Sequence, residues 1–329
     1  MACAPVLVTR RIPEAGLQCL LDAGLEFDVF ADDRSPSREE FLRIVPGRSG
    51  ILALLHDRID AEALDAAGPQ LRCVSNFAVG YNNIDIEEAT RRGVLVTNTP
   101  DVLTEATADL AWSLIMAAAR RICEGDRMVR AGEFHGWEPM MLLGQDLVGK
   151  TLGIVGAGRI GSAVARRSRG WEMRVLYTDS SVNESLERDL GASRVDLDTL
   201  CSESDVISVH CPLMEETHHL FGADQFGRMK TTAVFVNTAR GPIHDEAALA
   251  QALRDGVIAA AGLDVFEREP SVDPLLMELD NAVLLPHIGS ATRPTRDRMA
   301  ITAAENLIAA LRGERPANLL NPEVIEGRP

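Results

Sequence analysis

The sequence predicts an α/β protein of two domains, each built around a parallel β-sheet. The chain has 329 residues, which corresponds to about two domains at roughly 150 residues each. Short apolar, β-branched runs alternate with segments of helical periodicity, and this alternation is typical of βαβ units. Apolar residues make up 46% of the chain and aromatic residues only 4%. Small aliphatic side chains must therefore fill the core, as they do where helices pack on a parallel sheet.

The first hundred residues form one alternating series. We expect strands at 6–9, 51–55, 71–77 and 94–97, and helices at 14–23, 38–45, 61–67 and 86–92. Gly24, Gly68 and Gly93 each follow a predicted helix, where a left-handed C-cap residue is common. The series ends at Pro100. Because proline cannot lie inside a helix, we place a domain boundary there.

A long helix is predicted from Thr104, a suitable N-cap, to about Arg130. Residues 132–149 have no clear period, which indicates a loop that crosses or embraces another part of the protein. A second series starts at Thr151, with strands at 152–155, 174–177, 206–210, 233–237, 259–264 and 283–285 and helices at 160–169, 184–190, 197–203, 223–228 and 246–255. A last helix is expected at 296–311, and its period does not decide which domain it joins.

The charge balance and the cysteines exclude several classes of protein. Lys and Arg number 33 against 49 Asp and Glu, a formal charge of −16, which argues against binding to nucleic acid or to anionic membranes. The six cysteines are scattered without a C-x-x-C pair, so we expect reduced thiols and no metal; they are Cys3, Cys19, Cys73, Cys123, Cys201 and Cys211. The apolar run 2–8 precedes Arg10 and Arg11, the wrong order for a signal peptide. A cytoplasmic protein is expected.

The strongest local signal is a glycine-rich turn. Gly156, Gly158 and Gly161 stand in G-x-G-x-x-G order between a predicted strand and a predicted helix. Such glycines allow a tight turn, close approach of a pyrophosphate and close helix packing, and the helix N-terminus attracts the phosphates. The alternative is a glycine-rich βα turn that binds nothing. Asp179 ends the next strand, where an acid bonds the ribose hydroxyls of NAD and repels the 2′-phosphate of NADP. We therefore predict NAD(H), with NADP(H) possible; in the alternative Asp179 caps the following segment.

Three charged residues stand at the ends of late strands. They are Arg240, Glu269 and His287, and ligands of an open α/β sheet bind beyond the carboxyl ends of its strands. Singly, each could be an ordinary surface or buried residue. Together they suit reduction of a 2-keto acid. A histidine donates the proton, a carboxylate stabilises the imidazolium, and an arginine fork binds the substrate carboxylate.

Long stretches of the chain resemble one enzyme family. They read NFAVGYNNID, NTPDVLTEATADLAWSLIMAAARR, FHGWEPMMLLGQDLVGKTLGIVGAGRIG, VNTARG, GLDVFEREP and LLPHIGSAT. They resemble the D-isomer-specific 2-hydroxyacid dehydrogenases, and within that family the glyoxylate/hydroxypyruvate reductases. The resemblance implies that Arg240 polarises the substrate, that Glu269 partners the histidine and that His287 is the proton donor. It implies substrate-binding residues at Val79, Gly80, Trp137, Arg240, His287 and Ser290, where the backbone N–H groups of Val79 and Gly80 hold the carboxylate.

The resemblance also implies the cofactor contacts and the domain layout. Besides the three glycines and Asp179, the cofactor contacts are Thr107, Arg159, Ile160, His210, Cys211, Pro212, Thr217, Thr238, Ala239, Arg240, Asp264, His287 and Gly289. A Rossmann-like NAD-binding domain, 101–289, would be inserted into a discontinuous flavodoxin-like substrate domain, 1–100 and 290–329. The two crossings would form a hinge. Similar enzymes are homodimers, and in some of them the tryptophan at position 137 reaches the neighbour's substrate site; its alternative role is that of a loop anchor.

Three functions stay open on the sequence alone. The first is reduction of glyoxylate and hydroxypyruvate. The second is oxidation or reduction of a larger acid, such as 2-ketogluconate or another 2-keto acid. The third is an NAD-sensing binding protein like the transcriptional corepressors of this fold. The complete set of Arg240, Glu269 and His287 favours an enzyme. Asn82 stands where relatives often carry Asp, and nothing in the sequence explains this difference.

Overall fold

The named strands run parallel within two sheets in residues 5–326, the part of the chain that the computed structural model describes. The chain divides into two units. Unit 1 comprises Met1–Leu103 and Ala291–Pro329, and unit 2 comprises Thr104–Ser290. Each unit buries its own apolar residues on both faces of its own sheet, as parallel sheets require.

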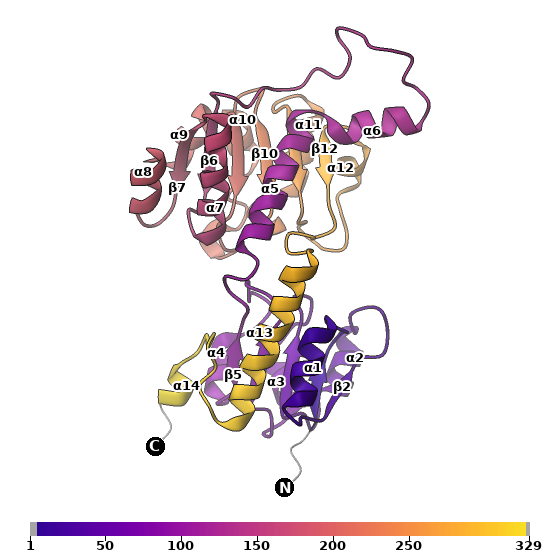
Figure 1. Cartoon of the computed structure of the whole chain (residues 1–329), viewed down its shortest axis with the longest axis vertical. Coiled ribbons are helices and arrows are strands. Elements are labelled where there is room, and N and C mark those ends of the chain that lie inside the picture. Colours follow the sequence, from indigo (N-terminus) through magenta and orange to yellow (C-terminus); the bar gives the residue numbers. More distant parts are fainter. Residues whose placement is uncertain (1–4, 327–329) are drawn as a thin grey trace. The chain divides into compact units, whose positions relative to one another are not determined.

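Unit 1 is a doubly wound sheet in the order β2-β1-β3-β4-β5. Its strands are β1 (Val6–Val8), β2 (Phe27–Val29), β3 (Gly50–Ala53), β4 (Cys73–Asn76) and β5 (Leu95–Thr97). One face is covered by α1 (Glu14–Asp22) and α13 (Arg293–Arg312), and the other by α2 (Arg38–Ile44), α3 (Ala61–Ala67) and α4 (Ile86–Arg91); α14 (Glu323–Glu326) follows. The final long helix therefore joins the first series of strands, where it packs beside α1 (Figure 1).

Unit 2 has the sheet order β12-β11-β10-β9-β6-β7-β8. Its strands are β6 (Thr151–Val155), β7 (Arg174–Thr178), β8 (Ser193–Arg194), β9 (Val206–Val209), β10 (Val234–Asn237), β11 (Ala260–Leu263) and β12 (Ala282–Leu284). One face carries α5 (Thr104–Ala119), α7 (Arg159–Arg167) and α8 (Glu184–Leu190), and the other α9 (Leu197–Glu203), α10 (Ala223–Arg228), α11 (Glu246–Arg254) and α12 (Pro274–Glu278). The strand order reverses between β6 and β9, so a ligand crevice is expected where the loops after these strands meet.

The prediction of a single helix over residues 104–130 is wrong. The structure has two helices there, α5 and α6 (Ile122–Arg130). Arg121 adopts a left-handed conformation with φ 52°. The carbonyl of Ala119 instead accepts a hydrogen bond from the backbone N–H of Gln145, at 2.8 Å. The N–H of Gln145, in the returning loop, thus replaces the N–H that the next turn of a continuous helix would have donated to Ala119. Sequence patterns also missed β2, β8 and α12, which are too short to show a period.

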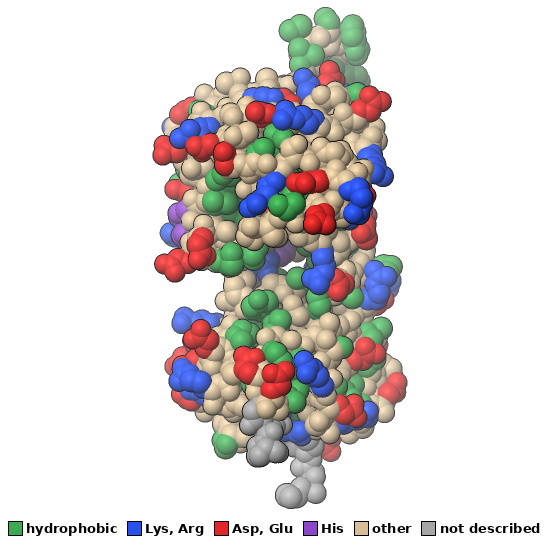
Figure 2. Space-filling model, turned by 90° about the vertical axis from the view of Figure 1, so that its left-hand side faces the viewer, with side chains coloured by type: hydrophobic (Ala, Val, Ile, Leu, Met, Phe, Trp, Pro, Cys, Tyr) green, Lys and Arg blue, Asp and Glu red, His purple; other side chains and the backbone are tan. Residues whose placement is uncertain are grey.

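α6 and the loop after it stand out from the body of unit 2 (Figure 1). We call residues 122–148 the arm. Figure 2 shows hydrophobic side chains gathered on the projection at the top of the view. The exposed large hydrophobic residues of the arm are Ile122, Val129, Phe134, Trp137, Met140, Leu143 and Val148. Exposed apolar patches of this kind mark interaction surfaces.

In residues 5–326 the structure contains no helix with the length and apolarity that crossing a membrane requires. Five cysteines within this range are free thiols, namely Cys19, Cys73, Cys123, Cys201 and Cys211. Cys3 and the start of the apolar run at 2–8 lie outside the described residues. No group of three or more His, Cys, Asp or Glu side chains in the described range is arranged to hold a metal ion.

Candidate functional site

The glycine-rich turn joins β6 to α7, beside the loop after β9. Gly156 has φ +90°, and a Cβ on it would lie 2.5 Å from the backbone nitrogen of Cys211. A Cβ on Gly161 would lie 2.1 Å from the carbonyl oxygen of Gly156. Both glycines are therefore required by the packing of the protein itself. A Cβ on Gly158 would meet no atom within 4 Å, so the backbone is open there to a ligand.

The carboxylate of Asp179 lies against this turn. One oxygen accepts a hydrogen bond from the N–H of Ala157 at 2.8 Å, and the other accepts from Ser181 N–H at 3.3 Å. The first contact fits an acid beside the cofactor turn, and the second fits the alternative of a local cap. Sequence reasoning missed Arg194, whose guanidinium donates to the backbone carbonyls of Asp179 and Ser180 at 2.7 and 3.1 Å. A cation thus stands next to the acid.

His287 and Glu269 form a pair at the carboxyl edge of the same sheet. His287 Nδ1 lies 2.8 Å from Glu269 Oε2, and Glu269 Oε1 accepts the N–H of Phe266 at 3.1 Å. His287 has a left-handed φ of 54°, a strained conformation for a non-glycine residue. Buried Asp264 supports it by accepting the N–H groups of Ile288 and Gly289, both at 2.7 Å.

Asp264 sits in a site where burial and hydrogen bonding oppose each other. Burial raises the pKa of Asp264, and the N–H groups of Ile288 and Gly289 act in the opposite direction. Thr107, in the first turn of α5, donates to the carbonyl of Gly289 at 3.3 Å. The segment that carries His287 is therefore anchored from two sides within unit 2.

Arg240 follows β10 and is half-buried. Burial lowers the pKa of its guanidinium, and the nearby charge of Glu269 opposes this shift. Sequence reasoning missed the residue that shapes this turn. Buried Asn237 donates to the Arg240 carbonyl at 2.8 Å and accepts the N–H of Ala239 at 2.9 Å. It also bonds His244 Nδ1 at 3.0 Å; burial lowers the pKa of His244 to about 4, so this histidine is a neutral acceptor.

A third missed residue, Glu246, holds the loop that carries Glu269. Glu246 is 6% exposed at the start of α11. One carboxylate oxygen accepts the N–H of Glu267 at 2.7 Å, and the other accepts the N–H of Asp273 at 2.6 Å. The same carboxylate thus ties both ends of the loop. The sequence does place both residues at positions that could have drawn attention. Asn237 is a polar residue at the end of an apolar strand, and Glu246 is an acidic residue at the start of a helix.

The loop after β9 carries four of the predicted cofactor contacts, His210, Cys211, Pro212 and Thr217. Burial lowers the pKa of His210 to about 3, and its Nε2 pairs with Ser208 Oγ at 2.8 Å. Burial also raises the pKa of Cys211 to about 11, so it stays a thiol at neutral pH. Thr217 Oγ1 donates to the carbonyl of Pro212 at 2.7 Å and closes the loop.

Most of the predicted residues in unit 2 share one edge of its sheet. They follow the carboxyl ends of its strands or lie in the first turn of α5 or α7: Thr107, Gly156, Gly158, Arg159, Ile160, Gly161, Asp179, His210, Cys211, Pro212, Thr217, Thr238, Ala239, Arg240, Asp264, Glu269, His287, Gly289 and Ser290. Trp137 does not join them, since it stands on the arm and is 81% exposed. Val79 and Gly80 lie in unit 1, in the loop after β4.

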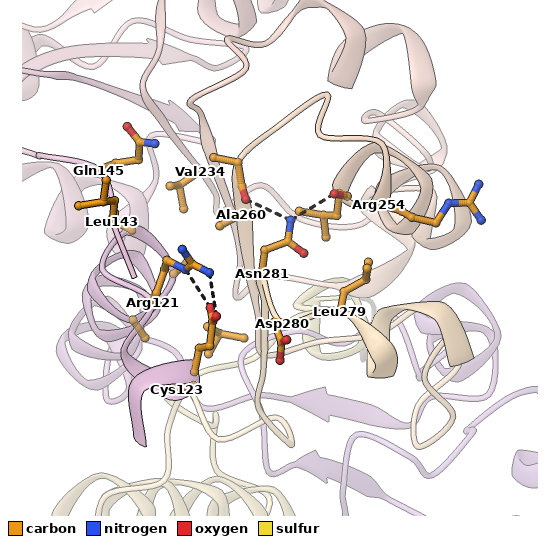
Figure 3. A pocket seen from close by; sticks show the side chains of 18 residues that line it. Arg121, Cys123, Leu143, Gln145, Val234, Arg254, Ala260, Leu279, Asp280 and Asn281 are labelled. Atoms are coloured by element: carbon orange, nitrogen blue, oxygen red, sulfur yellow. Dashed lines mark hydrogen bonds and ion pairs between the residues drawn. The ribbon is translucent and has the colours of Figure 1, made fainter. Parts of the chain in front are cut away.

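A pocket of about 480 Å³ lies at the opposite edge of the unit 2 sheet (Figure 3). Its walls include the end of α5 and the amino ends of β10, β11 and β12, represented by Ala118, Val234, Ala260 and Val283. None of the predicted site residues lines it in the described part of the chain. This pocket is therefore separate from the charged residues that suit catalysis.

Comparison with known proteins adds a family and a fold. Residues 112–289 match the family model described as D-isomer specific 2-hydroxyacid dehydrogenase, NAD binding domain. The chain is 54% identical over 326 residues to the glyoxylate reductase of Korarchaeum cryptofilum, covering 98% of both chains. A solved structure from Thermus thermophilus superposes with a TM-score of 0.90 at 45% identity, covering 96% of this chain and 99% of that one. An NADPH-dependent glyoxylate/hydroxypyruvate reductase from Sinorhizobium meliloti, in complex with NADP and malonate, has a TM-score of 0.85 at 33% identity and 97% coverage of both chains.

Proposed function

Because the chain belongs to the D-isomer specific 2-hydroxyacid dehydrogenase family, we propose that it reduces glyoxylate and hydroxypyruvate to the corresponding 2-hydroxy acids of the D series. The chain is an NAD(P)-dependent oxidoreductase. The observation that carries the proposal is the 2.8 Å pair of His287 and Glu269, on the same sheet edge as Arg240 and the glycine-rich turn. A paired imidazole and a half-buried guanidinium are the groups that keto-acid reduction needs.

The residues of unit 2 fit a nicotinamide dinucleotide. The backbone at Gly158 is open, the N-terminus of α7 offers N–H groups to phosphates, and buried Thr238 Oγ1 has no hydrogen-bond partner within the described range. When bound, the reduced cofactor supplies the hydride that adds to the carbonyl carbon. In this proposal unit 2, expected at 101–289, holds the cofactor, and unit 1, expected at 1–100 and 290–329, holds the substrate carboxylate through Val79 and Gly80.

The chain's own residues supply the proton and the orientation. In this proposal Glu269 accepts a hydrogen bond from the protonated Nδ1 of His287, 2.8 Å away. The proton on Nε2 is then the one donated to the substrate oxygen. Transfer of that proton converts the reduced carbonyl into a hydroxyl, and Glu269 stabilises the imidazolium beforehand. Arg240 binds the carboxylate and polarises the carbonyl with its donor fork. Ser290, and Trp137 from a neighbouring copy of the chain, complete the proposed substrate contacts.

A screen of NADH oxidation tests the substrate class. We expect the highest kcat/KM with glyoxylate or hydroxypyruvate, and lower values with pyruvate and 2-ketogluconate. A clear preference for 2-ketogluconate would favour the dehydrogenase of a larger acid. Binding of NADH without turnover of any 2-keto acid would favour the NAD-sensing protein instead.

We also propose that the chain prefers NAD(H) to NADP(H). The carboxylate of Asp179 beside the glycine-rich turn would repel a 2′-phosphate, and Ser180 and Ser181 offer no positive charge. The guanidinium of Arg194 is occupied by two backbone carbonyls. Asp179→Ser should lower the ratio of kcat/KM for NADH over NADPH by about tenfold, and Arg194→Ala should leave the ratio near the wild-type value. A wild-type preference for NADPH would contradict the proposal.

We also propose that the chain forms a homodimer through the exposed apolar side chains of the arm. Its apolar side chains, among them Phe134, Trp137 and Met140, are 51%, 81% and 75% exposed, which favours a protein partner. Sedimentation equilibrium should show a dimer, and replacing these three residues by serine should yield monomers. Met277→Ser is the matched control, since Met277 is 63% exposed on α12. A monomeric wild type would contradict the assembly.

The free thiols fit a reducing compartment, and cell fractionation should place the protein in the cytoplasm.

A further inference from the structure

The turn after β4 is held by its carbonyl groups. The carbonyl of Ala78 accepts the backbone N–H of Thr99 at 2.9 Å. The carbonyl of Val79 accepts the side-chain amide of Asn98, and that of Gly80 accepts the side-chain amide of Asn76, both at 2.8 Å. Three successive peptide groups are therefore oriented by donors outside the turn.

The directions of the three carbonyls also fix the directions of the N–H groups in the same peptides. In a planar trans peptide the carbonyl and the N–H point in opposite directions. The N–H groups of Val79, Gly80 and Tyr81 belong to the three peptides whose carbonyls are held, so each points away from its donor. The donors come from the ends of the neighbouring strands β4 and β5, and the three N–H groups consequently face away from these strand ends.

The donors are themselves buried and braced. Asn76 and Asn98 are 0% and 6% exposed. The amide of Asn76 pairs with that of Asn83 at 3.3 and 3.4 Å, and Asn83 donates to the carbonyls of Leu54 and Asp57, both at 3.1 Å. The carbonyl of Asn98 accepts the side-chain amide of Asn306 at 3.1 Å. The side-chain amide of Asn76 is thus braced by Asn83, and the backbone that carries Asn98 is braced by Asn306, so the donors that hold the turn are in place before any ligand arrives.

We propose that Asn98 and Asn76 are positioning residues that aim three backbone donors, the N–H groups of Val79, Gly80 and Tyr81, at the substrate carboxylate. This inference rests on the proposed function, in which Val79 and Gly80 hold that carboxylate. It adds Tyr81 N–H as a third donor and assigns the preorganisation to two asparagines. Donors that are fixed in advance bind an anion without a reorganisation cost.

The test compares Asn98→Ala and Asn76→Ala with Asn321→Ala. Asn321 is 0% exposed in the same unit and bonds the N–H of Val96 and the carbonyl of Val94, away from the turn. It therefore controls for the loss of a buried amide. The measurements are kcat and KM for glyoxylate, the inhibition constant of oxalate as a non-reducible carboxylate, and the Kd of NADH as a check on folding.

We expect the KM for glyoxylate and the inhibition constant of oxalate to rise together by about tenfold in Asn98→Ala and Asn76→Ala, the effect of losing about one hydrogen bond. The kcat should change less, because the lost interaction acts on ground state and transition state alike. Asn321→Ala and the Kd of NADH should stay near wild type. Equal rises in Asn321→Ala, or unchanged constants in the turn variants of an active enzyme, would overturn the inference alone. A wild type that turns over no keto acid would overturn the proposed function. In that case the Kd of oxalate for the NADH complex, compared between wild type and the turn variants, would still test the positioning by Asn98 and Asn76. A wild type that does not bind oxalate would overturn both the proposed function and the inference.

Discussion

Two alanine substitutions in the glycine-rich turn separate what the protein requires from what a cofactor requires. At Gly161 an added Cβ would lie 2.1 Å from the carbonyl oxygen of Gly156, far inside the contact distance of about 3.5 Å. Backbone atoms must move to relieve this contact. At Gly158 the added Cβ would have no neighbour within 4 Å. The backbone there has φ −71° and ψ −159°, an extended conformation outside the left-handed region that favours glycine.

The magnitudes follow from these contacts. Gly161→Ala overpacks the junction of β6 and α7, which costs about 1–3 kcal/mol and should lower Tm by about 2–12 °C. Gly158→Ala gains about 0.4–1 kcal/mol from the unfolded chain and loses a similar amount at the helix N-cap. Its Tm should therefore stay within about 2 °C of wild type. Its Kd for NADH should rise at least about tenfold, equivalent to ~1.4 kcal/mol, because the methyl group takes space proposed for the pyrophosphate.

Thermal unfolding without cofactor and titration of NADH fluorescence measure the two effects. The reasoning is refuted if Gly158→Ala destabilises the unliganded protein as much as Gly161→Ala does. It is also refuted if Gly158→Ala binds NADH with the wild-type Kd, since the open space at this glycine would then serve no ligand.

Three further substitutions test the reacting groups. His287→Ala should lower kcat by about 10²- to 10⁴-fold through loss of the general acid, and a wild-type kcat in steady-state assays would remove His287 from the mechanism. Arg240→Lys should raise the KM for the keto acid by about tenfold or more, because a point charge does not replace a donor fork; an unchanged KM would count against this role. Asp264→Asn leaves one acceptor oxygen for the N–H groups of Ile288 and Gly289, so it should cost about 1.5–3 kcal/mol of stability and lower kcat. Unaltered thermal unfolding and turnover would show that Asp264 does not support His287.

The chemistry-bearing residues were predictable because each depends on residue type and local spacing. The glycine-rich turn is recognisable from three glycines between an apolar run and a helical segment. Arg240, Glu269 and His287 follow apolar runs, and parallel strands bring such positions to one edge. The supporting residues were not predictable. Asn237 and Glu246 matter through bonds to residues up to 27 positions away, and no local pattern shows which backbone groups a buried amide or carboxylate will meet.

The sequence by itself determined the α/β class, the parallel sheets and the glycine-rich turn, because hydrophobic period and glycine placement act over a few neighbouring residues. Tertiary structure alone decided the strand orders and the break at Arg121, and it shows the packing that places α13 in unit 1, which the family resemblance had implied and the helical period had left open. In each case the deciding contact spans a long stretch of chain. The hydroxyl of Ser75 in β4 bonds the carbonyl of Ala303 in α13, 228 residues away, and Gln145 captures the carbonyl of Ala119. Periodicity records which face of an element is apolar, whereas the partner that covers that face is set by packing between distant segments.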